Sequence, residues 1–181
     1  LDYPDESCDW TRKAADTRKA VLEKTWDTDR SRFCDVLPDN FQKSPCFPAT
    51  SFYPFFTDIV GGAHLPGLGH LLDPGKFWTE FPVPTVSLDD PLFDAEARWK
   101  GVRHSCPWSG RVWPMTNSHL CEALARTAQR LDASLAPAAA DLLQRFVRMM
   151  FHDGDVERPN CFEHYSPTTG EPSRYRGTDD Y

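Results

Sequence analysis

The sequence lacks any apolar run of about 18 residues, the length that a membrane-spanning helix requires. It also lacks an excess of positive charge, because 20 Lys and Arg face 27 Asp and Glu, for a net charge of −7. Nucleic acids and anionic membranes both attract basic surfaces. We therefore expect neither a nucleic acid nor a membrane as partner. The opening residues, LDYPDE, do not resemble a signal peptide, which leaves the compartment unknown but favours the cytoplasm.

Motifs that bind metals or nucleotide cofactors are missing as well. The six cysteines form no CxxC pair, and the six histidines form no HExxH motif. No GxSxG, Walker or GxGxxG motif occurs. Asp89 and Asp90 are adjacent but precede Pro91, a pattern typical of a turn. We expect no metal, no cofactor, and free, buried thiols rather than a disulfide framework.

Aromatic residues and prolines are abundant. Aromatic residues make up 13% of the chain, and 16 prolines accompany them. Many of the aromatic residues lie in proline-rich segments, such as 41–56 and 76–93, and not in periodic ones. This pattern suggests aromatic side chains held on loops, as sugar-binding clefts need.

Apolar periodicity predicts helices separated by long loops, and no alternating pattern supports a large sheet. The predicted helices are Asp5–Asp27, a short one after Ser51 that has Pro54 in its first turn, a short apolar one ending near Asp73, one from Thr116, and Ala136–His152. Either Thr116 or Asn117 could cap the fourth helix, and Gly154 could end the fifth. These last two helices are joined by few residues, which predicts an antiparallel hairpin.

Each long helix has an expected apolar face. The expected core residues are Trp10, Ala14, Val21, Leu22 and Trp26 in the first; Leu120, Leu124, Ala128 and Leu131 in the fourth; and Ala139, Leu142, Leu143, Phe146, Val147 and Met150 in the fifth.

One loop, CPWSGRVWPMTN, could form a sugar-binding surface. Trp108 and Trp113 flank a turn at Gly110, and indole rings stack on the apolar faces of sugar rings. Arg111 lies between them and could meet a carboxylate or a hydroxyl. The alternative is that both tryptophans pack in the core between helices, where Trp is usually found.

A second segment, NCFEHYSPTTGE, contains Glu163 between Phe162 and His164, ahead of a predicted β-turn at 167–170. A carboxylate in an aromatic setting can act as a general base on a water molecule. The alternative is a salt-bridged or capping carboxylate, as most surface glutamates are.

Taken together, the two segments resemble a known family. WSGRVWPMTN, a helical hairpin and then CFEHYSPTTG are similar to the C-terminal part of inverting glycosidases with an (α/α)6 toroid. The most similar group is glycoside hydrolase family 63, with mannosylglycerate hydrolase-like enzymes and processing α-glucosidases, and trehalases are related. The matching positions are Trp108, Gly110, Trp113, Pro114, Asn117, Glu163, Tyr165, Thr169 and Gly170.

The resemblance implies that Glu163 is the general base and that an upstream Asp, absent from these residues, is the general acid. It implies a carbohydrate substrate, either an oligosaccharide or a glycosylated small acid. Asn117 would order the junction between loop and helix or reach the substrate. Ser109 and Arg111 depart from the family pattern, which often has Arg and Pro there. The implied substrate-binding residues are Trp108, Gly110, Arg111, Trp113, Asn117 and Tyr165.

The expected fold is all-α, a partial (α/α)6 toroid of helical hairpins with long aromatic loops. We expect residues 1–181 to be an incomplete C-terminal portion of one catalytic domain, which has the rest of that domain as its partner and is inactive alone. Two alternatives remain: a non-catalytic helical carbohydrate-binding or scaffold module, and a toroid lyase or epimerase that uses Tyr or His in place of Glu.

Overall fold

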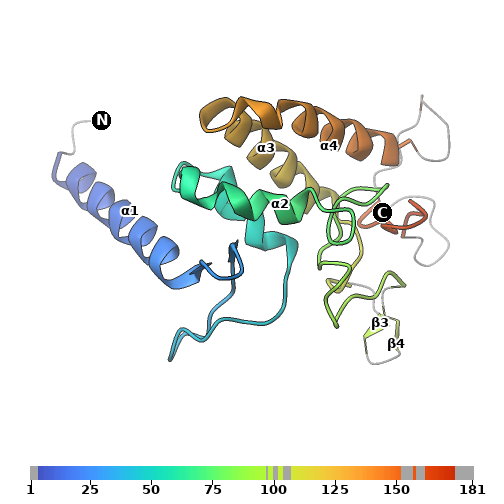
Figure 1. Cartoon of the computed structure of the whole chain (residues 1–181), viewed down its shortest axis with the longest axis horizontal. Helices are drawn as coiled ribbons and strands as arrows, with labels where there is room; N and C mark the ends of the chain where they lie inside the picture. The colour runs from blue at the N-terminus through green and yellow to red at the C-terminus, as the bar shows by residue number, and fades with distance from the viewer. Residues whose placement is uncertain are drawn as a thin grey trace.

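The structure is a computed structural model that describes residues 4–96, 98–99, 102–103, 107–151, 157 and 162–173. Its fold is all-α, as predicted (Figure 1). The α-helices are α1 (Pro4–Thr25), α2 (Leu68–Leu71), α3 (Pro114–Arg130) and α4 (Ala136–Met149), and the 3₁₀ helices are η1 (Ala49–Phe56), η2 (Gly62–Gly67) and η3 (Ala133–Leu135). Two short antiparallel pairs complete it: β1 (Trp26–Asp27) with β2 (Arg32–Phe33), and β3 (Arg98–Trp99) with β4 (Val102–Arg103).

The core lies where α3 packs against η1 and α4. The predicted apolar stripe of α3 is confirmed, because Leu120 and Leu124 are fully buried and Ala128 is nearly so. The aromatic residues of the proline-rich segments contribute several of the other large side chains. Those that are buried in this core are Phe47, Phe52, Phe55 and Phe77. The expectation that such residues line a cleft is therefore wrong for Phe52, Phe55 and Phe77, because edge-to-face packing in the core buries them.

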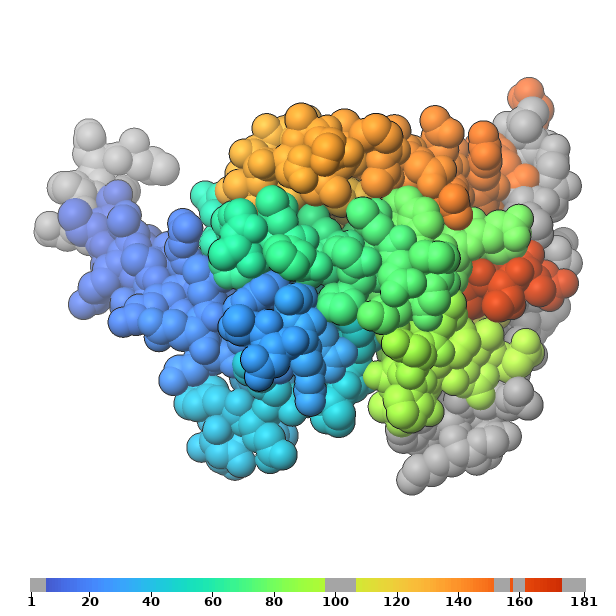
Figure 2. All heavy atoms as spheres, viewed as in Figure 1, coloured from blue at the N-terminus to red at the C-terminus, as the bar shows by residue number. Residues whose placement is uncertain are grey.

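Helix α1 extends away from the body of the molecule (Figures 1 and 2). Its last turns carry Val21 and Leu22, which pack against the core together with Trp26. Trp26 contacts Phe33 across the β1–β2 pair, and their ring centroids are 4.8 Å apart. Trp10 is 66% exposed, however, so its predicted place in the core is wrong. The chain turns back at the β1–β2 hairpin directly after α1. Only the end of α1 that adjoins this hairpin therefore lies against the core.

Helix α3 begins two residues earlier than expected, at Pro114. Trp113 occupies the capping position in an extended conformation, without a side-chain cap. Proline suits the first helical position because its φ is already helical and no N–H is needed there. Thr116 and Asn117 lie inside the first turn, fully buried, so neither is the cap.

Helix α4 pairs with α3 as predicted, but its buried face is narrower than the pattern suggested. Leu142 and Met149 are buried, whereas Leu143 and Val147 are 51% and 46% exposed. Only one side of α4 packs against α3. Leu143 and Val147 are four residues apart, so together they lie on another side of the helix. The helix ends at Met149, and Gly154 lies outside the described residues.

The described cysteines are free thiols, as expected, but they are not all buried. Cys34 is buried, Cys46 and Cys121 are half-buried, and Cys8 is exposed because it lies on the projecting part of α1. Burial raises the pKa of Cys46 to about 11, with the nearby Asp90 carboxylate adding to the effect. Burial likewise raises the pKa of Cys121 to about 11. The remaining two, Cys106 and Cys161, lie outside the described residues.

Candidate functional site

A row of backbone hydrogen bonds joins three loops beside the start of α3. Val112 N donates to Tyr165 O at 2.9 Å, and Tyr165 N donates to Val112 O at 2.8 Å. On the other side, Thr85 N donates to Arg111 O at 3.1 Å, and Ala49 N donates to Thr85 O at 2.8 Å. Figure 1 shows the C-terminal segment next to these loops. The two segments that the sequence singled out are therefore direct neighbours.

The two tryptophans of the WSGRVW loop stack face to face. Their ring centroids are 4.3 Å apart and their planes differ by 13°. Trp113 is only 7% exposed, and its Nε1 donates to Pro107 O at 2.9 Å. Trp108 is 43% exposed. The alternative interpretation, packing in the core, therefore holds for Trp113. Trp108 stacks on it and reaches the surface.

Gly110 shapes the loop between the tryptophans. Its φ of +149° is one that side-chain-bearing residues rarely adopt, and a Cβ there would lie 2.9 Å from Asp94 O and from the Phe93 ring. Its N–H donates to Thr85 Oγ1 at 3.0 Å. The close approach of these chains requires glycine at this position.

Arg111 donates three side-chain hydrogen bonds inside the protein. Nε reaches His164 Nδ1, Nη1 reaches Ala95 O and Nη2 reaches Glu171 O, each at 3.1 Å. The side chain is 8% exposed. These contacts join three separate segments of chain, and a contact of Arg111 with substrate stays a prediction.

Asn117 and Tyr165 are buried in the frame of the site. Asn117 is fully buried and its Nδ2 donates to Trp113 O and Val83 O, both at 3.1 Å. These bonds support the first of its two expected roles, ordering the junction between loop and helix. Tyr165 is 1% exposed, and its hydroxyl accepts from Phe162 N at 2.9 Å. Direct contact of either residue with substrate stays a prediction.

Glu163 is half-buried between two buried residues, Phe162 and His164. The His164 ring lies 5.4 Å from the Trp113 ring. Within the described part of the chain, the Glu163 carboxylate has no hydrogen bond and no ion pair. Neither the salt bridge nor the cap of the alternative interpretation is therefore present among these residues.

A turn follows Glu163 at the predicted place, but it is a five-residue turn that starts at Ser166 and not the predicted β-turn at 167–170. Gly170 N donates to Ser166 O at 3.0 Å, and Gly170 has a φ of +70°. A Cβ on Gly170 would collide with the Phe81 ring. The loop consequently packs closely on the segment that carries Phe81, and only glycine permits this approach.

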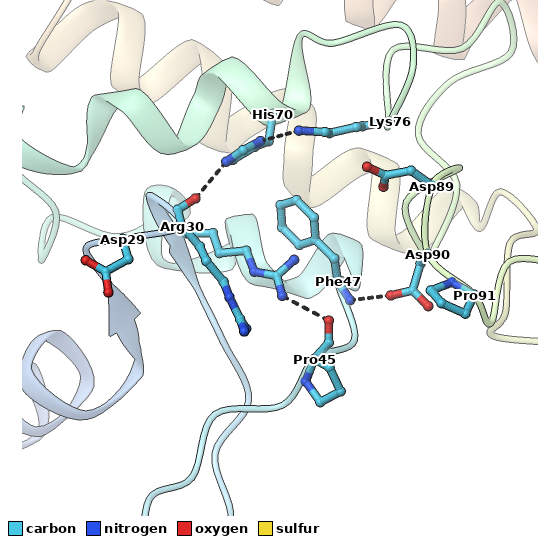
Figure 3. Close-up of a pocket in the computed structure, with 10 residues that line it drawn as sticks. Asp29, Arg30, Pro45, Phe47, His70, Lys76, Asp89, Asp90 and Pro91 are labelled. Carbon is cyan, nitrogen blue, oxygen red and sulfur yellow. Dashed lines mark hydrogen bonds between the residues drawn. The ribbon is translucent and has the colours of Figure 1, made fainter.

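A cavity of about 530 Å³ was not predicted from the sequence (Figure 3). Three basic and three acidic side chains line it, from loops distant in sequence: Arg30, Arg32, Lys76, Asp29, Asp89 and Asp90. Phe47 and His70 also line it. Figure 3 shows His70 and Lys76 across the cavity from Asp90.

Much of this charge is already satisfied within the protein. His70 Nδ1 lies 3.0 Å from Lys76 Nζ, and its Nε2 lies 2.9 Å from Arg30 O. Since Lys can only donate, Nδ1 accepts and Nε2 carries the proton. Asp90 accepts from Phe47 N and Leu92 N, which confirms the predicted turn at this position. The residues that line the cavity therefore hold its loops together by hydrogen bonds. Their positive and negative charges are equal in number, which favours no particular ligand.

Among the residues that the structure describes, no group of three His, Cys, Asp or Glu side chains could hold a metal ion. None of the described helices is both long and apolar enough to cross a membrane.

Comparison with solved structures shows the fold in larger proteins. A sialidase structure shares 18% identity with a TM-score of 0.78, and the match covers 96% of this chain and 16% of the sialidase. The mannosylglycerate hydrolase of glycoside hydrolase family 63 from Thermus thermophilus, in complex with glucose, shares 20% identity with a TM-score of 0.65. That match covers 87% of this chain and 33% of the hydrolase. The same enzyme in complex with Tris and D-glycerate shares 21% identity, with a TM-score of 0.64 and coverage of 86% and 33%.

The chain thus spans about a third of the length of the Thermus hydrolase and less of the sialidase. No curated protein matches it significantly. Residues 2–181 match the family described as the mannosylglycerate hydrolase MGH1-like glycoside hydrolase domain. The all-α architecture and the joined Trp and Glu segments agree with this match. The chain belongs to the MGH1-like family of glycoside hydrolase domains.

Proposed function

We propose that this chain is part of the catalytic domain of an inverting glycoside hydrolase and that Glu163 is its general base. The observation that carries the proposal is the pair of hydrogen bonds between Val112 and Tyr165. These bonds put the segment that carries Glu163 beside the loop that carries the two tryptophans, which supports a shared site for the carboxylate and the aromatic surface. A base and a surface for a sugar ring are two parts that glycoside hydrolysis needs.

The environment of Glu163 suits a general base. Its half-buried carboxylate is not used in a salt bridge or a cap within the described residues, so its oxygens remain available to accept a proton. In the inverting mechanism this carboxylate removes a proton from a water molecule as the water attacks the anomeric carbon. An acid on the opposite face of the sugar protonates the leaving oxygen. The two carboxyl groups lie about 6.5–9.5 Å apart to leave room for the water.

The general acid is proposed to lie outside these 181 residues, in the rest of the domain. Exposed apolar side chains support the proposal that further chain packs here, since Trp10, Met115, Leu143 and Val147 are all more than 40% exposed. The Thermus hydrolase is more than twice as long as this chain, which leaves room for such a remainder. We propose that the chain alone is inactive, because it lacks protonation of the leaving group.

The proposed substrate is a carbohydrate, either an oligosaccharide or a sugar linked to a small acid. The exposed face of Trp108 would stack on a sugar ring, with Trp113 supporting it from behind. The solved relative was bound to glucose and to D-glycerate, which supports a sugar and leaves a small acid as one candidate for the leaving group.

The test is to replace Glu163 in the complete protein that carries this chain. Glu163→Gln should lower kcat by several orders of magnitude on an α-glycoside substrate, with little change in substrate binding. Glu122→Gln is the matched control, because Glu122 is exposed and, among the described residues, pairs only with Arg126 on the surface of α3. Near-normal turnover of Glu163→Gln would refute the proposed base.

A second candidate function is a non-catalytic sugar-binding module. The exposed stack of Trp108 on Trp113 favours it equally, because stacking needs no base. It predicts that the complete protein binds an oligosaccharide, measured by calorimetry, without hydrolysing it. A lyase or epimerase that uses Tyr165 or His164 is less favoured, because both side chains are buried at 1% exposure or less.

A further inference from the structure

We infer that Arg111 positions Glu163 for catalysis by holding the adjacent residue, His164; this inference rests on the proposed role of Glu163 as general base. Arg111 is thus assigned a role in turnover without touching the reacting atoms. The assignment begins from the hydrogen bond between Arg111 Nε and His164 Nδ1, 3.1 Å long and buried.

The bond determines how the His164 ring is held. An arginine side chain can only donate hydrogen bonds, so Nδ1 of His164 must be the acceptor and cannot carry a proton. The ring also packs at 5.4 Å from the Trp113 ring, with 41° between the planes. Its orientation is thereby set from two directions, and the side chain is fully buried.

The backbone of His164 is held as well. His164 O accepts from Ser173 N at 2.8 Å, and His164 N donates to Ser173 Oγ at 3.3 Å. The peptide bond between Glu163 and His164 is planar, so fixing His164 N also fixes the plane of the Glu163 carbonyl. The position of the Glu163 Cα therefore depends on the contacts that His164 makes.

Arg111 connects this residue to the other arm of its own loop and to one other segment. Nη2 donates to Glu171 O on the return arm of the same loop, and Nη1 donates to Ala95 O on the loop that precedes β3. The main chain of Arg111 itself is held by Thr85 N. This buried side chain thus acts together with the Val112–Tyr165 backbone pair in holding the Glu163 segment against the loop that carries the tryptophans.

A shift of the base by about 1 Å can lower turnover by about 10²-fold, because proton transfer depends steeply on geometry. A residue that served stability alone would reduce the amount of folded enzyme but leave kcat per folded molecule unchanged. The two roles are therefore separable by kinetics on folded protein.

The experiment compares Arg111→Gln and Arg111→Lys with Arg130→Gln in the complete protein, assayed on α-linked glycosides of mannose and glucose that include mannosylglycerate. Arg130 is the matched control: its guanidinium also holds two carbonyls, Thr57 O and Asp58 O, but at the opposite end of α3. We expect Arg111→Gln to lower kcat by about 10²-fold while KM changes by less than about threefold. Arg111→Lys should recover part of the loss, and Arg130→Gln should keep the parental kcat.

A pair of substitutions at His164 tests the same bond if the arginine variants fail to fold. The Oδ1 of Asn can replace Nδ1 as the acceptor, whereas Gln places its amide near the position of Nε2. We expect His164→Asn to retain more of the parental kcat than His164→Gln, by about tenfold or more. Equal kcat values for these two, or a kcat of folded Arg111→Gln equal to that of Arg130→Gln, would overturn the inference.

The result for Glu163→Gln separates the two levels of proposal. If that variant keeps its turnover, the proposed base is wrong. If it loses turnover while Arg111→Gln does not, only the positioning role of Arg111 is wrong.

Discussion

Trp108 stacks on Trp113 at 4.3 Å, yet the two indoles differ sharply in burial, with 43% of one and 7% of the other exposed. The inner ring is part of the interior and is anchored through Nε1, while the outer ring stacks on it and is partly exposed. An aromatic surface held in this way would lose little conformational freedom on binding the proposed sugar.

This difference predicts separate effects for the two tryptophans. Trp113→Ala should lower the free energy of unfolding by about 3–5 kcal/mol, the cost of removing a large buried side chain. Trp108→Ala should lower it by about 1 kcal/mol and weaken sugar binding by about tenfold or more, since one stacking contact is lost. Chemical denaturation and calorimetry with an oligosaccharide measure the two quantities. Equal destabilisation by both variants would contradict the layered arrangement.

Gly170 should not tolerate a side chain. Gly170→Ala would drive a Cβ into the Phe81 ring at a φ of +70°, so we expect a loss of more than about 1 kcal/mol of stability. Gly69→Ala is the matched control, because Gly69 lies in α2 and has no atom within 4 Å of the added Cβ. That control should be neutral or stabilising by up to about 1 kcal/mol. Urea denaturation of both variants checks the prediction.

Asn117 should contribute to stability through its two bonds to main-chain carbonyls. Asn117→Ala leaves Val83 O and Trp113 O without this donor in a buried place, at a cost of about 1–3 kcal/mol. Ser118→Ala, one position along, removes only an exposed hydroxyl that bonds to Met115 O. It should change stability by about 0.5 kcal/mol or less. A similar effect of the two substitutions would indicate that the Asn117 bonds do not hold the junction.

The cysteines should differ widely in reactivity. At about pH 8 the exposed thiol of Cys8 should react rapidly with an aromatic disulfide reagent, and Cys8→Ser should remove this rapid phase. Cys46 and Cys121 should react slowly, because their pKa values are raised to about 11 and little thiolate is present. Cys46→Ser is the control that should leave the rapid phase unchanged. A rapid phase that persists in Cys8→Ser and disappears in Cys46→Ser would contradict the assignment.

The same pKa values predict a loss of stability at alkaline pH. A thiol whose pKa is raised on folding holds its proton more tightly in the folded protein than in the unfolded chain. The stabilisation is therefore present below about pH 9 and is lost as the pH rises from about 9 towards 11. Replacing both residues with Ala should make the fall in melting temperature between about pH 9 and pH 11 shallower. An unchanged fall would show that other groups cause it.

Local patterns predict several elements well. The α3 stripe, the α3–α4 hairpin, the turn before Gly170 and the all-α class follow from periodicity, loop length and turn chemistry, which depend on neighbouring residues alone. The predicted start of α3 is wrong because two polar residues suggest a cap, while the proline ahead of them has already begun the helix. The predicted buried faces of α1 and α4 include residues that are exposed in the structure. A periodic apolar pattern shows which residues share a face but not how much of that face packs against a neighbouring element.

The sequence by itself determined most of the helices, the family and the two segments that carry the proposed chemistry. These features depend on the spacing of residues that lie close together in the chain. Only the tertiary structure decided that Val112 and Tyr165 pair and that one tryptophan is buried while the other is exposed. The tertiary structure also decided that the Arg111 guanidinium donates a hydrogen bond to His164 and so holds the loops of the site together. These facts depend on contacts between residues far apart in the chain, and such contacts are set by packing and hydrogen-bond satisfaction across the whole fold.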